Sequence, residues 1–93
     1  MNHTERVVRA GTDKASSLAN FARDLALPDW FGHNLDALAD ALRDVDDPRG
    51  RPVRVVWQGS ERLRRKDPEA YRAIASVLRD AAAERDDLEV RFE

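Results

Sequence analysis

LPDWFGHNLDALADAL, residues 27–42, is the stretch of this chain from which its fold can be worked out. Pro28 fixes its own φ angle and biases the residue before it away from helical geometry, so any preceding helix must end here. Gly32 allows a tight turn, and Asn34 is a good N-cap because its side chain can accept a hydrogen bond from a free backbone N–H. The leucines at positions 35, 38 and 42 recur at intervals of three and four, which predicts a helix of about two turns over residues 35–43.

The part of the chain before this stretch predicts a strand and then a helix. Residues 6–10 contain β-branched valines and stop at Gly11, which favours a first strand followed by a turn. Thr12 or Asp13 can cap the helix that follows. Apolar residues then recur on one helical face, which we expect to lie in the core: Ala15, Leu18, Phe21, Ala22 and Leu25.

The part directly after the stretch predicts a loop and a buried strand. Residues 44–52 form a loop by composition, with two prolines, a glycine and several aspartates. Residues 53–57 make the best strand in the sequence because three of the five are valine and the last is tryptophan. Their nearly continuous apolar character favours a central position in a covered sheet, and Gly59 ends the strand.

The last third of the chain predicts two helices and a final strand. Residues 60–66 are expected to form a short helix. Residues 67–69 read DPE, a strong start signal with a capping acid and a proline at the first helical position, and the helix that follows ends near Glu84 or Arg85. Apolar and polar residues alternate over residues 88–92, which predicts a strand with one buried face.

The predicted order of elements is β-α-α-β-α-α-β, in an α/β domain. Each connection between strands is long and helical, which suits parallel strands. Right-handed crossovers would pack three or four helices against a three-stranded parallel sheet. A chain of 93 residues, 42% of them hydrophobic, can build one compact core and not two. We therefore expect a single domain over residues 1–93, with a loose N-terminal end at residues 1–5.

Composition and motifs argue against an enzyme. The chain has no cysteine, and its two histidines, His3 and His33, lie in no known nucleophile, zinc or phosphate-loop motif. We expect no cofactor and no metal, and we interpret His33 as a solvated turn residue. No apolar run approaches the ~18 residues of a membrane span, and the first residues are polar. We expect neither signal peptide nor membrane anchor, and a cytoplasmic location.

Two acids share one side of the helix predicted over residues 35–43. Asp36 and Asp40 are four residues apart, so they project about one 5.4 Å turn from each other. Like charges at this spacing cost an isolated helix about 0.2–0.5 kcal/mol. The positive end of the helix dipole compensates Asp36, whereas Asp40 has no such compensation. The spacing alone is compatible both with a solvated acidic face and with a binding surface.

Residues 27–42 resemble the signature segment of the barstar family in their proline, aromatic pair, glycine and NLDAL core. Trp57 on the middle strand and LRDA at residues 78–81 extend a weaker resemblance over nearly the whole chain. The resemblance implies an inhibitor whose second helix and preceding loop plug the active site of a secreted, guanyl-specific microbial ribonuclease and imitate its substrate. The partner-binding residues that it implies are Trp30, Gly32, Asn34, Asp36, Asp40 and Asp80.

The chemistry of the segment agrees with this implied role. A ribonuclease presents Arg, Lys and His to stabilise a phosphate, so carboxylates held one turn apart can occupy the sites of anionic oxygens. The leucine stripe on the opposite face anchors the helix to the core, so little ordering remains to be lost on association. We expect a monomer that forms a 1:1 complex with the ribonuclease and binds neither nucleic acid nor membrane directly.

Departures from the barstar pattern keep other interpretations open. Ala39 stands where the family often has an aromatic, Asp80 stands where it has a glutamate, and the loop over residues 43–52 is longer. One alternative is therefore a barstar-like interaction module that binds a different basic partner without inhibiting a ribonuclease. Nucleic-acid binding is less favoured, because the formal net charge is −2 and no aromatic alternates with the basic residues Arg49, Arg51, Arg54, Arg62, Arg64, Arg65 and Lys66.

Overall fold

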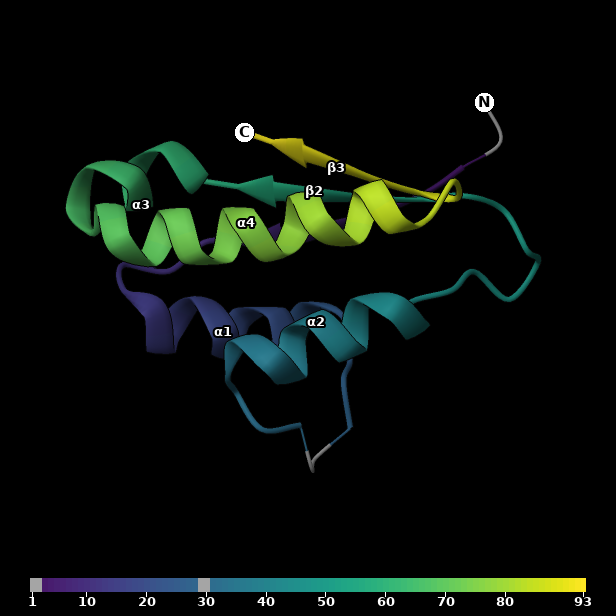
Figure 1. Cartoon of the computed structure of the whole chain (residues 1–93), viewed down its shortest axis with the longest axis horizontal. Coiled ribbons are helices and arrows are strands. Elements are labelled where there is room, and N and C mark those ends of the chain that lie inside the picture. The colour runs from purple at the N-terminus through teal and green to yellow at the C-terminus, as the bar shows by residue number, and fades with distance from the viewer. Residues whose placement is uncertain (1–2, 29–30) are drawn as a thin grey trace.

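The computed structural model describes residues 3–28 and 31–93, and its elements follow the predicted order (Figure 1). The elements are β1 (Thr4–Arg9), α1 (Lys14–Asp24), α2 (Leu35–Asp44), β2 (Val53–Gln58), α3 (Ser60–Lys66), α4 (Pro68–Glu84) and β3 (Leu88–Phe92). The predicted α/β class and the three-stranded parallel sheet are confirmed, with four helices. Within the described residues, no helix is both long enough and apolar enough to cross a membrane.

Strand β2 lies in the middle of the sheet, as its sequence predicts. It pairs in parallel with β1, where Val8 stands opposite Trp57, and in parallel with β3, where Trp57 stands opposite Phe92. Four of its six residues are buried: Val53, Val55, Val56 and Trp57. A strand with a neighbour on each side pairs its backbone N–H and C=O groups within the sheet. Such a strand can be buried, which agrees with the apolar sequence of β2.

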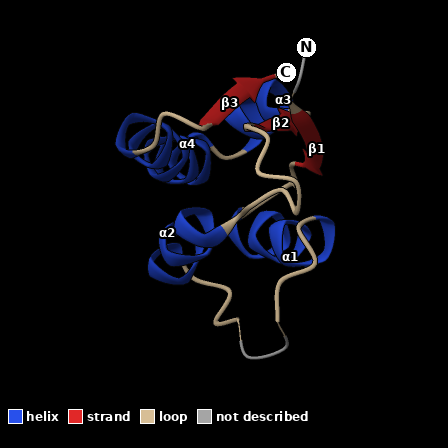
Figure 2. Cartoon of the chain, turned by 90° about the vertical axis from the view of Figure 1, so that its right-hand side faces the viewer, coloured by secondary structure: helices blue, strands red, loops and turns tan. Residues whose placement is uncertain are grey.

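The two faces of the sheet differ in their surroundings. Helices α1, α2 and α4 lie on one side of it (Figures 1 and 2). On the other face, Arg54 of β2 forms ion pairs with Glu5 of β1 and Glu89 of β3, at N–O distances of 3.5 and 2.9 Å. Val7, also of β1, is 45% exposed. The helices therefore cover one face, and a row of charges crosses the other.

Trp57 joins the sheet to the helices at the centre of the core. Its side chain is completely buried. Its ring lies 6.1 Å from that of Phe21 in α1, 5.7 Å from that of Tyr71 in α4 and 5.8 Å from that of Phe92 in β3, measured between centroids. Offset and edge-on aromatic contacts of this kind add to the stabilisation from buried area.

Helix α1 covers the end of the free edge of β1. The side-chain amide of Asn20 donates to the carbonyl oxygen of Arg9 at 2.9 Å, and the carboxylate of Asp24 accepts from the N–H of Arg9 at 3.0 Å. Main-chain groups that would otherwise be unpaired at a sheet edge are thus satisfied by side chains.

Strand β1 begins earlier than the sequence predicts. The expectation of a loose end over residues 1–5 is wrong for Thr4 and Glu5, which belong to the strand. The N–H of Thr4 donates to the carbonyl oxygen of Pro52 at 2.8 Å, and its hydroxyl donates to the carboxylate of Asp47. Both partners lie more than forty residues away, so no local pattern could reveal them.

The helix caps follow their sequence signals closely. Asp13, rather than Thr12, caps α1, and its carboxylate accepts a hydrogen bond from the N–H of Ser16 at 2.8 Å. Asp67 caps α4, with Pro68 in the first turn as expected. Helix α2 runs to Asp44, one residue past its predicted end.

Candidate functional site

Helix α2 has a buried side and an exposed side. Leu38 and Leu42 are completely buried and hold the helix against the core. Asp36 and Asp40 are exposed and lie about one turn apart. The structure therefore places both predicted acids on the solvent side of an anchored helix.

The loop before α2 is held by its capping residue. Asn34 accepts a hydrogen bond from the N–H of Ala37 at 2.8 Å, and its side-chain amide donates to the carbonyl oxygen of Gly32 at 3.2 Å. A Cβ atom on Gly32 would lie only 2.9 Å from that amide nitrogen, so a larger residue would require the Asn34 side chain to shift. The positive φ angle of the turn, 46°, falls on His33 and not on Gly32. His33 is exposed, with its ring edge-on to Phe31 at 5.3 Å between centroids.

Asp40 forms an ion pair with an arginine of its own helix. Its carboxylate lies 2.9 Å from the guanidinium of Arg43, and their side chains are 73% and 61% exposed. Arg43 also lies 3.8 Å from the carboxylate of Glu84 in α4. An ion pair whose two side chains are both this exposed contributes about 0–1 kcal/mol to stability. The pairing with Arg43 can therefore be broken at little cost in free energy.

Two predicted site residues remain, Asp80 and Trp30, and the structure describes only the first of them. Asp80 is exposed on α4, a different helix from the one that carries Asp36 and Asp40. Helices α2 and α4 pack against each other, so the two acidic helix surfaces belong to neighbouring elements. Trp30 lies outside the described residues.

A pocket of about 450 Å³ lies beside the acidic side of α2. Most of its lining residues are apolar, and its charged lining residues are Arg6, Asp40, Asp44 and Asp46. Asp40 therefore lies next to a concave surface. Nowhere in residues 3–28 and 31–93 do three or more histidine, aspartate or glutamate side chains form a group that could hold a metal ion.

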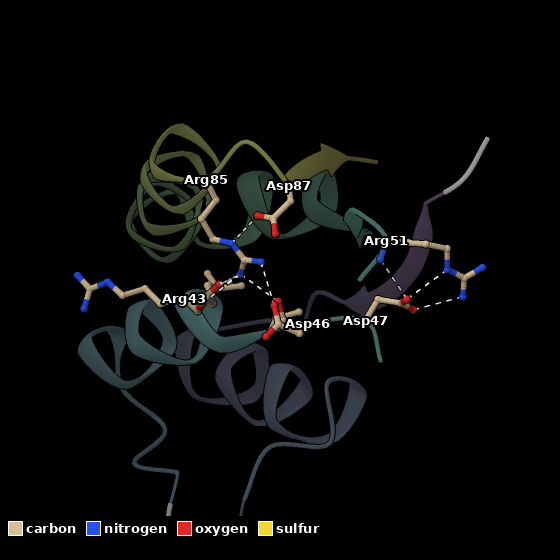
Figure 3. A network of polar contacts seen from close by, with 8 residues as sticks. Arg43, Asp46, Asp47, Arg51, Arg85 and Asp87 are labelled. Carbon is tan, nitrogen blue, oxygen red and sulfur yellow. Dashed lines mark hydrogen bonds and ion pairs between the residues drawn. The ribbon is translucent and has the colours of Figure 1, made fainter. Parts of the chain in front are cut away.

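Arg85, which sequence reasoning marked only as a helix end, connects the C-terminal ends of α2 and α4 (Figure 3). Its Nη1 atom donates to the carbonyl oxygens of Leu42 and Val45, at 2.8 and 2.9 Å, and to that of Arg43 at 3.2 Å. Its guanidinium also forms ion pairs with Asp46 at 3.2 Å and Asp87 at 2.9 Å. Its side chain is only 15% exposed. These partners are up to 43 residues away in sequence, which is why no local signal identifies them.

Asp47 forms a second polar cluster in the loop after α2 (Figure 3). Its side chain is 4% exposed and lies 3.2 Å from the guanidinium of Arg51. It also accepts hydrogen bonds from the N–H groups of Arg49 and Arg51 and from the hydroxyl of Thr4. The guanidinium and the hydroxyl hold the pKa of Asp47 well below its ordinary value, despite the opposing effect of burial. The composition of this segment predicted a loop, and nothing in it indicated which aspartate is buried.

Several of the basic residues considered for nucleic-acid binding have acidic partners within the chain. Arg64 lies 3.1 Å from Glu61, Arg51 is paired with Asp47, and Arg54 is paired with two glutamates across the sheet. Their charges are partly neutralised, which weakens the interpretation of these residues as a continuous phosphate-binding surface.

A family comparison agrees with this geometry. The family model described as Barstar (barnase inhibitor) matches residues 3–93, essentially the whole chain. The match includes α2, its preceding loop and the helix that carries Asp80. The chain is a member of the barstar family of ribonuclease-inhibitor domains.

Proposed function

We propose that this chain inhibits a secreted, guanyl-specific microbial ribonuclease by inserting the acidic side of α2 and its preceding loop into the active site. The observation that carries the proposal is that Asp36 and Asp40 are exposed on a helix whose opposite side, at Leu38 and Leu42, is completely buried. Membership of a family described by barnase inhibition supplies the class of partner.

The proposed chemistry is substitution of carboxylates for phosphates. A ribonuclease active site gathers cationic side chains around an anionic substrate, and charge-assisted hydrogen bonds to carboxylates use the same donors. Asp40 would exchange its exposed pairing with Arg43 for cations of the enzyme. The acidic side of the helix should also speed the encounter with a basic cleft, an effect that weakens as salt is added.

The remaining residues would complete the contact. Trp30, Gly32 and Asn34 would contribute from the loop before α2, and Asp80 would contribute from α4. The complex would contain one copy of each protein, and the inhibitor would act in the cytoplasm, where it would neutralise the enzyme before export.

The test is a titration of guanyl-specific microbial ribonucleases, beginning with barnase, against the purified chain, with RNA cleavage as the readout. We expect cleavage to stop at a 1:1 ratio. Asp40→Ala should weaken inhibition more than Asp29→Ala does. Glu69→Ala is a further control, because it removes an exposed acid from the N-terminal turn of α4.

Two results would contradict the proposal in different ways. Equal inhibition by all three variants would remove the acidic helix from the mechanism. If the unmodified chain inhibits none of the ribonucleases, the alternative of a barstar-like module with a different basic partner takes its place.

A further inference from the structure

The C-terminal end of α2 lacks the usual means of satisfying its last carbonyl groups. The residue after the helix, Val45, is extended, with φ −66° and ψ 119°, so the left-handed cap that ends many helices is missing. Arg43 is the only basic residue in the last turn, and its guanidinium is directed to Asp40 and Glu84. The carbonyl oxygens of Leu42, Arg43 and Val45 are instead satisfied by Arg85.

The charges around this helix end favour a cation at the position of Arg85, whose side chain is partly buried. The C-terminal end of a helix carries partial negative charge, and α2 adds Asp40 and Asp44 near that end. Helix α4 ends beside it without any basic residue in its last turn. The guanidinium of Arg85, the residue that follows α4, bonds the negative end of α2, and Asp46 and Asp87 balance its charge.

The position of Arg85 connects this polar contact to the proposed binding surface. Arg43 lies 3.8 Å from Glu84, directly before Arg85. Asp40 precedes Arg43 by three residues and Asp80 precedes Glu84 by four, so each acid lies about one turn upstream of the contact between the two helices. The bonds of Arg85 join the C-terminal end of α2 to the residue that directly follows α4.

We propose that Arg85 is a positioning residue for ribonuclease inhibition, which holds the acids of α2 and the acid of α4 in one rigid arrangement without touching the enzyme. This inference rests on the proposed function. It assigns a positioning role to a residue that is 15% exposed and whose donors are occupied within the chain.

The test compares Arg85→Met, which removes every donor, with Arg85→Lys, which keeps the charge but has one nitrogen in place of three. Arg72→Met is the matched control, because Arg72 is an exposed arginine of α4, the helix that ends directly before Arg85. We expect Arg85→Met to raise the rate of dissociation from barnase about tenfold, equivalent to ~1.4 kcal/mol. Arg85→Lys should give a smaller increase, and Arg72→Met should dissociate like the unmodified chain. A dissociation rate of Arg85→Met equal to that of Arg72→Met would overturn the inference.

A second measurement separates positioning from a purely structural role. Asp80→Ala is made both in the unmodified chain and in Arg85→Met, and the loss of affinity is compared. If Arg85 positions the two helices, Asp80→Ala should cost a smaller factor in the Arg85→Met background. If Asp80→Ala costs the same factor in affinity in both backgrounds, and Arg85→Met does no more than lower the free energy of unfolding, then Arg85 only stabilises the fold.

Amide hydrogen exchange keeps the inference testable if the unmodified chain inhibits no ribonuclease. That result would remove the proposed function by itself. Faster exchange in α2 of Arg85→Met, but not of Arg72→Met, would still support the positioning of α2 by Arg85. Unchanged exchange would overturn it.

Discussion

The two ends of helix α2 are held in contrasting ways. At the C-terminal end, Leu42 is completely buried, a guanidinium bonds the last carbonyls, and the following loop buries Val45. At the N-terminal end, one exposed side chain, that of Asn34, caps the helix, and the residue before it has a positive φ angle. The helix is thus fixed tightly where it meets α4 and lightly where it meets the loop.

The residues that stabilise α2 therefore differ largely from the acids that are proposed to bind a partner. The groups that anchor the helix are buried or occupied within the chain, so a partner cannot use them. The exposed acid Asp40 contributes little to the fold, because its ion pair with Arg43 is exposed on both sides. The following predictions test this division, beginning with the largest effect.

Leu42→Ala should lower the free energy of unfolding by about 2–5 kcal/mol, because it removes a completely buried side chain at the firmly held end. Leu35→Ala, at the other end of the same helix, should cost less than half as much, since Leu35 is only partly buried. Urea denaturation of both variants measures the difference. Equal losses would show that the two ends are anchored alike.

Asp47→Asn should produce the next largest loss, and that loss should depend on pH. The pKa of Asp47 lies below its ordinary value in the folded state, so the stabilisation is complete above the unfolded pKa and disappears as pH falls toward the folded one. The difference in unfolding free energy between the unmodified chain and the variant should therefore be greatest near neutral pH and should shrink below about pH 4. Thermal denaturation from pH 7 to pH 2 provides the measurement. A difference that stays constant over this range would contradict the assigned ion pair.

Asn34→Ala should cost about 1 kcal/mol, the usual value of an N-cap. Asn34→Ser keeps a capping oxygen and should cost less. Circular dichroism in urea measures both. A loss as large as that of Leu42→Ala would mean that the N-terminal end is as firmly fixed as the other.

Asp40→Ala should change the free energy of unfolding by less than about 1 kcal/mol, because its ion pair with Arg43 is exposed on both sides. The same variant should weaken ribonuclease inhibition clearly. Stability and inhibition are measured on one preparation. A large loss of stability would show that Asp40 helps to anchor α2. The exposed side of the helix would then contribute to the free energy of unfolding as its buried side does.

The sequence predicted those features that depend on neighbouring residues. Leucine spacing, Asn34 and the DPE start predicted the helices, and the valines ending in Trp57 predicted the central strand; the structure confirms each of them. The exposure of Asp36 and Asp40 also followed from helical periodicity. Their role in binding stays a prediction.

Features that depend on distant parts of the chain could not be predicted. Arg85 bonds carbonyl groups 40 to 43 residues away, and Asp47 bonds a hydroxyl 43 residues away. Arginine and aspartate are common in loops and at helix ends. Only the folded structure shows that Arg85 and Asp47 are the ones that make these long-range bonds. The longer loop that separated this chain from the family pattern proves to contain the buried residues Val45 and Asp47.

The contacts of Asn20 and Asp24 with Arg9 also bear on how this protein behaves in concentrated solution. An unpaired strand is a template to which a strand of another molecule can add, the first step toward aggregation. Since α1 already occupies the main chain of Arg9, the end of β1 is closed to such growth, and the other edge of the sheet is β3. There Glu89, Arg91 and Glu93 are exposed charged residues, and charged side chains on an edge strand discourage the addition of another strand.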